Sequence, residues 1–407
     1  MTKDRQSQIE FVGLMAALMS IAALALDALL PALDIIGHAI GTTSLAQNQL
    51  LITLFFLGLG TGPLLFGPIS DSIGRKPVVY AGFVLFVFAS MLCIYTTSFE
   101  GMIIGRILQG IALSAPRTIS VAMIRDKFSG DYMARVMSFV AVVFILVPVV
   151  APAMGKWVLD SFGWEAIFEV QVFFAILVAI WFWKRQPETL VKEKRTSFRP
   201  AIFITGFKEL FNYKQTIAFT FIWGFITGSF LVYLSTAQQV FEEQYLLKES
   251  FPYIFATLAI TIGTATLLNG TLVIRFGMLR LITWAMLGYV LIPLIYVLIY
   301  YNGMNPPYWV VLMFFAMEFF AVGFIFGNLR ALAMEPVGHI AGIGAAITGC
   351  IATVMAVPIS AYIGSFVVDS VLPIFIGFLA CGIMAYAILG YFFLSKRGFF
   401  LRLKMNK

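Results

Sequence analysis

Long apolar segments recur along the whole chain and are separated by short polar loops. Each segment holds about 20 predominantly apolar residues, which is the length that an α-helix needs to cross the hydrocarbon core of a bilayer. The pattern therefore predicts an all-α membrane protein with twelve transmembrane helices. The predicted spans are residues 10–33, 47–67, 77–96, 101–124, 133–156, 164–184, 215–237, 251–272, 279–300, 307–333, 341–368 and 372–395.

The longest polar segment, Lys184 to Lys214, divides the twelve spans into two groups of six. Within it, residues 201–211 have an amphipathic pattern, so we expect this stretch to lie along the membrane surface. We therefore predict an N-terminal six-helix bundle, a cytoplasmic linker, a C-terminal six-helix bundle and a basic cytoplasmic tail. These four parts cover residues 1–184, 185–214, 215–395 and 396–407.

A short basic turn between the second and third predicted spans, residues 67–77, has a faded copy at residues 270–280. In both turns two glycines stand seven positions apart, and both turns carry basic residues at or near their end. Ile274 of the copy stands where Asp71 stands in the first turn. One unit that was duplicated and then specialised explains this repetition, so we expect two pseudo-symmetric halves.

The composition agrees with a membrane protein and orients it. Of the 407 residues, 61% are hydrophobic and 12% are charged, whereas about a quarter of the residues are charged in soluble domains. With a cytoplasmic N-terminus, only Lys156 and Lys248 among the loop Lys and Arg lie on the outer side. The positive-inside rule therefore predicts that both termini are cytoplasmic. Orientation in a membrane also explains the net charge of +7 better than nucleic-acid binding does.

The chain shows no pattern of a catalytic or metal site. Cys93, Cys350 and Cys381 all fall inside apolar runs, where we interpret them as small buried hydrophobes. His38 and His339 lack metal-ligand spacing. Because a nucleophile elbow, a P-loop and a zinc motif are also missing from the sequence, we expect neither an enzyme nor a metal protein.

Ionisable residues inside predicted spans are functional candidates, because burying a charge in hydrocarbon is expensive. Asp27 of the first span and Arg106 of the fourth lie at similar depths, so we expect them to pair. Arg117 follows Arg106 by eleven residues, which places it within about 20° of the same helix face and roughly 16 Å deeper. This polar face of the fourth span must line a cavity or pack against partners.

Two acidic residues in other spans have alternative interpretations. Glu318 lies near the middle of the tenth span, and we predict it as a proton-coupling residue, with a protonated acid hydrogen-bonded to a neighbouring helix as the alternative. Glu169 lies near the outer end of the sixth span, where an interfacial position is the alternative.

Aromatic and kinking residues complete the candidate set. The 41 Phe favour a largely apolar cavity. Aromatic residues of membrane spans also pack against helices or lipid, which is the alternative role for the four candidate cavity residues Phe55, Trp223, Phe230 and Tyr233. A cluster in the fifth span is predicted to bend that helix, with close helix packing as the alternative; it consists of Pro148, Pro152 and Gly155.

Several of these motifs resemble those of the major facilitator superfamily. The first turn resembles the signature between helices two and three of that family, with matches at Gly67, Asp71, Gly74, Arg75 and Lys76 and a departure at Ser72. The stretch Arg106-x-x-Gln109-Gly110 resembles the family's helix-four motif. The stretch Pro152-x-x-Gly155 is similar to the helix-five motif of drug antiporters, although Val147, Ala151 and Lys156 replace glycines.

Further motifs resemble the bicyclomycin/chloramphenicol resistance (Bcr/CflA) group of multidrug efflux proteins within that superfamily. They are Asp27-x-x-x-Pro31-Ala-Leu, Arg125-Asp126, Trp164-x-x-x-Phe168, Pro187-Glu188-Thr189 and the run from Ala331 to Gly342.

The resemblance implies a major facilitator fold of two six-helix bundles, each made of inverted three-helix repeats, with alternating access to a cavity between them. It implies that Asp27 and Arg106 form the proton-coupled pair. It also implies a cytoplasmic latch in which Asp71 and Arg75, with Asp126 as the acidic partner, clamp the eleventh span.

Together these observations predict a proton-coupled multidrug efflux antiporter in the cell inner membrane. It would export amphipathic drugs such as chloramphenicol- or bicyclomycin-like compounds as a monomer, driven by the proton gradient without a cofactor. Its partners would be drugs, protons and membrane lipid, with no nucleic acid. A proton-coupled symporter of the same fold that imports a small metabolite is the alternative, and a non-transporting membrane scaffold or receptor is a further one.

Overall fold

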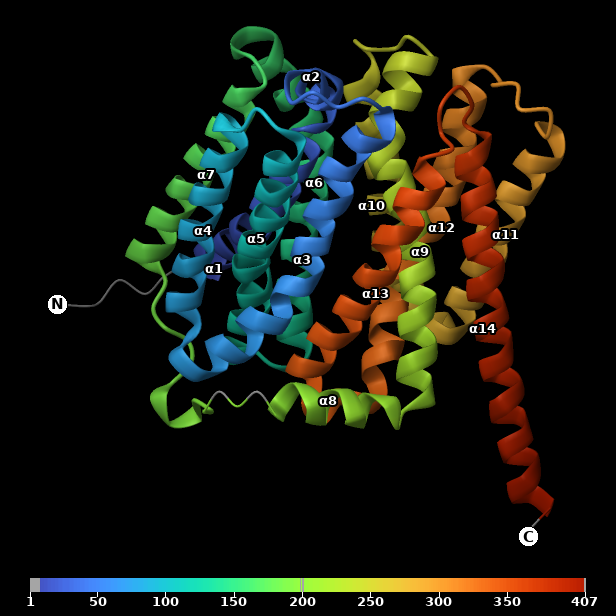
Figure 1. The fold of residues 1–407 in the computed structure, drawn as a ribbon. Coiled ribbons are helices and arrows are strands. Elements are labelled where there is room, and N and C mark those ends of the chain that lie inside the picture. Colours follow the sequence, from blue (N-terminus) through green and yellow to red (C-terminus); the bar gives the residue numbers. More distant parts are fainter. Residues whose placement is uncertain (1–7, 198, 200, 406–407) are drawn as a thin grey trace. The chain divides into compact units, whose positions relative to one another are not determined.

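The computed structural model describes residues 8–197, 199 and 201–405, and every regular element in that part of the chain is a helix (Figure 1). The all-α class is therefore confirmed. The chain separates into two compact units, one made of Met1–Pro200 and Ala237–Ile260 and the other of Ala201–Thr236 and Thr261–Lys407. The division into bundles that we derived from the sequence stays a prediction.

The first unit contains the seven α-helices α1 to α7, two 3₁₀ turns and one π-helical turn. They are α1 (Gln8–Asp27), η1 (Leu30–Ala32), α2 (Leu33–Ala39), α3 (Leu45–Ile73), α4 (Arg75–Tyr95), α5 (Phe99–Lys127), α6 (Gly130–Phe162), α7 (Glu165–Arg185), η2 (Lys192–Lys194) and the π-helical η3 (Gln239–Gln244).

The remaining described helices belong to the second unit, except that the end of α9 and the beginning of α10 lie in the first unit. They are α8 (Ala201–Phe211), α9 (Lys214–Gln238), α10 (Phe251–Phe276), α11 (Met278–Ile299), α12 (Tyr308–Met334), η4 (Glu335–Ile340), α13 (Ala341–Gly364) and α14 (Leu372–Met405). The boundary between the units passes through α9 and α10.

Ten helical segments of the described chain are long and apolar enough to cross a membrane. One of them, Tyr308–Gly364, contains two predicted spans separated by η4. Helix α6 overlaps the predicted span 133–156 but is not among the ten. The chain is thus a multi-pass membrane protein, while the count of twelve transmembrane helices stays a prediction.

Helix α5 occupies the centre of the first unit and packs against α3 and α4 (Figure 1). Small residues allow this close approach: a Cβ at Gly110 of α5 would overlap the carbonyl oxygen of Phe55, and one at Gly58 of α3 would overlap that of Ile107. Glycine-lined contacts of this kind are the usual way in which helices pack in lipid, where no hydrophobic effect brings them together.

The repeated turn of the sequence recurs in the backbone. Gly74 ends α3 and begins α4 with φ of 108°, and Gly277 ends α10 and begins α11 with φ of 80°. Glycine reaches this region without the strain that a Cβ would bring. The surroundings differ, because a Cβ would meet Glu188 and Arg195 at Gly74 but open space at Gly277. Only the first turn is therefore built into a side-chain network.

The predicted amphipathic segment forms α8, which lies across the ends of α9 and α13 (Figure 1). Gly206 of α8 faces Ile343 and Ile347 of α13. Its Glu209 also pairs with His339 in η4. These contacts fix α8 to one end of the second unit.

Candidate functional site

Arg106 is fully buried in α5 and is held by main-chain carbonyl groups of two other helices. Its Nε donates to the carbonyl oxygen of Leu51 in α3 at 3.0 Å, and its Nη1 donates to that of Ala25 in α1 at 3.2 Å. Nη1 also donates to Oε1 of Gln109 at 2.7 Å, one turn further along α5. One guanidinium thus ties together α1, α3 and α5.

The ring of Phe55 lies beneath this guanidinium, with 4.4 Å between the ring centroid and Cζ of Arg106. Such cation–π stacking is strongest where water is excluded, and Phe55 is fully buried. We predicted Phe55 as a drug contact; the structure places its ring against Arg106.

The ion pair that we expected between Asp27 and Arg106 is not formed within the described residues. Asp27 ends α1 and is only 3% exposed. The donors of Arg106 are instead satisfied by carbonyl oxygens, and its Nη2 has no hydrogen-bond partner in the described part of the chain. Arg106 is nevertheless bound to the same end of α1, because its acceptor Ala25 precedes Asp27 by two residues.

The helical path breaks directly after Asp27. Pro31 stands in the 3₁₀ turn η1, where its missing N–H and fixed φ do not allow α1 to continue. Irregular backbone at membrane depth is tolerated where protein covers it or a cavity solvates it. Here Gly155 of α6 covers it so closely that a Cβ would overlap the carbonyl oxygen of Ala28.

The predicted bending cluster therefore has at least one packing role. Pro148 and Pro152 both lie inside α6, which continues through them from Gly130 to Phe162. Gly155 supplies the close approach to the break after α1. Bending of α6 at these positions stays a prediction.

The predicted latch residues lie together at the turn between α3 and α4. The buried guanidinium of Arg75 donates from Nη1 to Oδ1 of Asp71 at 2.5 Å and to Oγ of Ser70 at 2.7 Å. Its Nε and Nη2 donate to the two carboxylate oxygens of Asp126 at 3.0 and 3.4 Å. Charge-assisted bonds of this paired geometry are the stronger class of hydrogen bond in proteins. Of the other predicted latch residues, Lys76 has Nζ 5.9 Å from the centroids of two aromatic rings and Gly67 accepts from Ser70 Oγ.

Sequence reasoning missed two members of this network. Glu188 and Thr189, in the chain that follows α7, hydrogen-bond to the N-terminus of α4 and to Asp126. Their only signal was the motif Pro187-Glu188-Thr189, to which we gave no role.

Sequence reasoning also missed a second polar cluster in the first unit. This cluster joins the segment Ala237–Ile260 to α3 and α6. Lys156 Nζ lies 2.9 Å from Asp160 Oδ2 and 3.1 Å from Glu249 Oε1. Gln49 donates to Gln239 at 2.9 Å, with both side chains buried. Lys156 replaces a glycine of the helix-five motif. It thus pairs with one carboxylate on its own helix, Asp160, and with one on the segment Ala237–Ile260, Glu249.

Glu318 is fully buried in α12 of the second unit, and neither carboxylate oxygen has a hydrogen-bond partner among the described residues. The alternative of a carboxylic acid hydrogen-bonded to a neighbouring helix therefore lacks its partner. The hydroxyl of Tyr289 is an electrostatic neighbour of Glu318 and hydrogen-bonds with Ser229 at 2.6 Å. A buried polar group without a partner needs a specific explanation.

The candidate aromatic residues of α9 lie in the same unit. Tyr233 packs on Phe319 and Phe315 with centroid distances of 4.6 and 5.1 Å, and Phe230 packs on Phe319 at 5.3 Å. Phe319 follows Glu318 directly in α12, so these rings surround the helix turn that carries the buried acid. Trp223 lies further along α9, 6.0 Å from the Arg330 guanidinium.

Two further ionisable candidates have simpler positions. Arg117 is half-buried on α5, and its predicted cavity role stays a prediction. Glu169 is exposed in the second turn of α7, which agrees with the interfacial alternative. No cluster of three or more His, Cys, Asp or Glu suited to a metal ion occurs in the described ranges.

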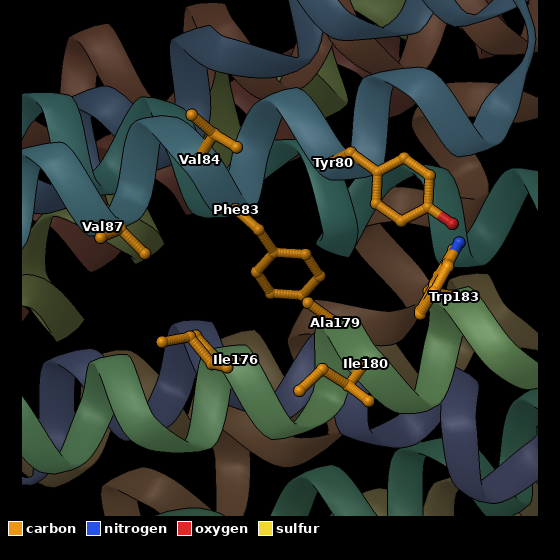
Figure 2. Close-up of a pocket in the computed structure, with 9 residues that line it drawn as sticks. Tyr80, Phe83, Val84, Val87, Ile176, Ala179, Ile180 and Trp183 are labelled. Carbon is orange, nitrogen blue, oxygen red and sulfur yellow. The ribbon is translucent and has the colours of Figure 1, made fainter.

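Figure 2 shows a largely apolar groove between α4 and α7. Its volume is about 440 Å³. The groove runs from Val87 to Tyr80 along α4 and from Ile176 to Trp183 along α7. Trp183 is 63% exposed, and none of the predicted site residues lines the groove. Exposed apolar walls on a membrane protein face lipid, so we do not assign this groove to substrate.

The comparisons with known proteins agree with the motifs. The sequence profile described as Major Facilitator Superfamily matches residues 15–358. The chain is 28% identical to the bicyclomycin resistance protein homolog of Haemophilus influenzae, over 86% of this chain and 87% of that protein. It is 30% identical to the chloramphenicol resistance protein of Pseudomonas aeruginosa, over 67% of this chain and 64% of that protein.

The fold also matches a solved transporter. The structure superposes on the crystal structure of a D-xylose–proton symporter with a TM-score of 0.76. The match covers 94% of this chain and 97% of that chain, and the sequences are 16% identical. At this identity the likeness concerns the fold alone. The predicted resemblance to the Bcr/CflA group is confirmed by the two relatives, and the profile match along most of the chain shows that this protein belongs to the major facilitator superfamily.

Proposed function

We propose that this protein is a proton-coupled multidrug efflux antiporter that exports amphipathic drugs, such as chloramphenicol- or bicyclomycin-like compounds, by alternating access. The names of its relatives support drug export. The observation that carries proton coupling is the buried Asp27 carboxyl at the end of a broken helix, two residues from a carbonyl that binds the buried Arg106 guanidinium.

Protonation of Asp27 changes the electrostatics of this region in a defined way. When Asp27 is ionised, its negative charge offsets the positive charge of Arg106, because charges interact strongly where water is excluded. When Asp27 is protonated, Arg106 keeps its charge but loses that compensation. The proton thus alters the free energy of the contact between α1, α3 and α5, which is where Arg106 joins these helices.

We propose that Glu318 is a second ionisable group of the transport path, in addition to Asp27. The carboxyl of Glu318 is buried without a hydrogen-bond partner in the described chain, and Tyr233 of α9 packs on Phe319, the next residue of α12. A carboxyl in such a place accepts either a proton or the cationic group of an amphipathic drug. The nearby Phe230 and Tyr233 supply apolar area for the rest of the drug.

The remaining parts of the proposal follow from the charge distribution of the sequence. Lys and Arg lie overwhelmingly in the loops of one side, which supports an inner-membrane protein with both termini in the cytoplasm. The proton gradient supplies the driving force, so the proposal needs neither a cofactor nor catalysis, and a monomer suffices for alternating access.

The test is drug-induced proton movement in proteoliposomes that carry a preset pH gradient and an internal pH dye. Wild type should dissipate the gradient when drug is added, whereas Asp27→Asn should not, although both purified proteins melt at similar temperatures. The matched control is Asp34→Asn, because Asp34 is a more exposed carboxylate of α2 paired with His38 at 3.5 Å; it should behave as wild type.

Each other outcome changes a specific claim. Gradient dissipation by Asp27→Asn at the wild-type rate would remove Asp27 from the coupling mechanism. A wild type that ignores every drug but moves protons together with a metabolite would replace export with the symport alternative.

A further inference from the structure

The N-terminus of α4 cannot cap itself. Gly74 occupies the N-cap position and has no side chain to accept from the first free N–H groups of the helix. Pro77 has no N–H, so the free donors of the first three helical residues are the backbone N–H groups of Arg75 and Lys76. A cap for this helix must therefore come from another part of the chain.

Glu188 provides that cap from the segment after α7. Its Oε1 accepts from the Arg75 N–H at 3.1 Å, and its Oε2 accepts from the Lys76 N–H at 3.0 Å. Oε1 also accepts from the N–H groups of Thr189 at 2.9 Å and Leu190 at 3.0 Å. A carboxylate at this position also meets the positive end of the helix dipole. One side chain thus fixes both the start of α4 and the fold of its own segment.

The same segment closes a ring of contacts around Arg75. Thr189 Oγ1 donates to Oδ2 of Asp126 at 2.8 Å, and this oxygen also accepts from Nε of Arg75. Seven residues further on, the N–H of Thr196 donates to the carbonyl oxygen of Asp71 at 3.0 Å. Glu188 binds the backbone of Arg75, and Asp126, which accepts from Thr189, binds its guanidinium. Both the backbone and the guanidinium of Arg75 are therefore linked to the segment that contains Glu188 and Thr189.

We propose that Glu188 and Thr189 are positioning residues of the latch, which set the backbone and guanidinium of Arg75 relative to Asp71 and Asp126. The proposal rests on the proposed transport function and adds to it a physical link between the latch and the polar segment that joins the two sets of six spans. Displacement of the chain at residues 188–196 pulls on both ends of the latch at once.

The first test compares Glu188→Gln with Glu193→Gln, which makes the same charge change on an exposed position of the same segment. The glutamine amide group cannot accept from the Lys76 N–H, so one charge-assisted bond is lost. We expect Glu188→Gln to lower the maximal rate of drug-driven proton movement by about tenfold, with drug binding unchanged. Glu193→Gln should transport as wild type.

A second measurement does not depend on transport. Hydrogen–deuterium exchange of the peptide that contains Arg75 and Lys76 should become about tenfold faster at the Lys76 amide in Glu188→Gln, because this amide loses its acceptor. Exchange in the same peptide should stay at the wild-type rate in Glu193→Gln.

A double-mutant cycle separates positioning of the latch from general stability. If Thr189 acts through Asp126, Thr189→Val should slow transport in the wild-type background but not further in an Asp126→Asn background. Thr189→Val keeps the shape of the side chain, so it also serves if Glu188→Gln fails to accumulate.

The outcomes of the two readouts are distinct. Unchanged amide exchange in Glu188→Gln overturns the positioning role, whether or not the protein transports drugs. Faster exchange with wild-type transport overturns the link to the transport cycle. Faster exchange in a protein whose wild type moves no protons with any drug upholds the cap and refutes the proposed function instead.

Discussion

The carbonyl cage around Arg106 predicts that lysine cannot replace this arginine, although lysine keeps the charge. A lysine ammonium is a single point on a flexible stem, so it reaches one of the acceptors that Nε and Nη1 of Arg106 bind on α1, α3 and α5. Arg106→Lys therefore loses at least two hydrogen bonds and the flat stacking on Phe55.

The size of the effect follows from the kind of bond that is lost. Hydrogen bonds to a charged group contribute about 1.5 kcal/mol each at the lower end of their range, so two lost bonds destabilise the first unit by about 3 kcal/mol. For a unit of 150–250 residues this corresponds to a melting temperature about 6–12 °C lower. Thermal unfolding in detergent measures it directly.

Arg330→Lys is the matched control, because Arg330 is exposed on α12 and its guanidinium lies 6.0 Å from the centroid of the Trp223 ring. It should melt within about 2 °C of wild type. If Arg106→Lys also melts within about 2 °C of wild type and still transports, the carbonyl cage does not hold Arg106. The residue would then act as a point charge alone.

Three further substitutions have defined expectations. Asp71→Asn removes a half-exposed partner of the latch worth about 0.2–1 kcal/mol, so transport should slow while equilibrium drug binding persists; loss of binding would refute the latch assignment. Glu318→Gln should leave the melting temperature unchanged or higher, since the carboxyl has no hydrogen-bond partner among the described residues, and should reduce efflux of cationic but not neutral drugs; equal loss for both classes would argue against a cation-binding role. Gly155→Ala should lower the melting temperature because overpacking of about 1–3 kcal/mol exceeds the gain in helix propensity, whereas Gly288→Ala in open space should not; similar results for the two would refute close packing at the break after α1.

The parts of the fold that sequence predicts well are those set by local chemistry. The two turns with matching glycine spacing both place a glycine at positive φ between two long helices, because only glycine enters that conformation without strain. Asp71 and Arg75 stand four residues apart and pair across the turn. Such contacts are visible in the order of residues.

The parts that sequence misses depend on main-chain atoms or on distant partners. The acceptors of Arg106 include the carbonyl oxygens of Ala25 and Leu51, and any residue type supplies a carbonyl, so no pattern announces them. Glu188 follows Arg75 by 113 positions. The two residues meet only because the chain after α7 returns to the start of α4, and this return is not visible in the sequence.

Arg75 and Arg106 are both buried in the first unit but differ in what holds them, and we infer from this difference that they have different roles. Arg75 is bound by the carboxylates of Asp71 and Asp126, so its charge is compensated in place. Arg106 is bound by neutral oxygens, and its Nη2 has no partner in the described chain. A buried charge without a counter-charge costs several kcal/mol. In the proposed mechanism Asp27 supplies that counter-charge only while it is ionised, so each proton that binds Asp27 would raise the free energy of this arrangement. Arg75 therefore suits a latch whose charges are paired within it, whereas in the proposed mechanism Arg106 suits a part whose energy changes when Asp27 binds a proton.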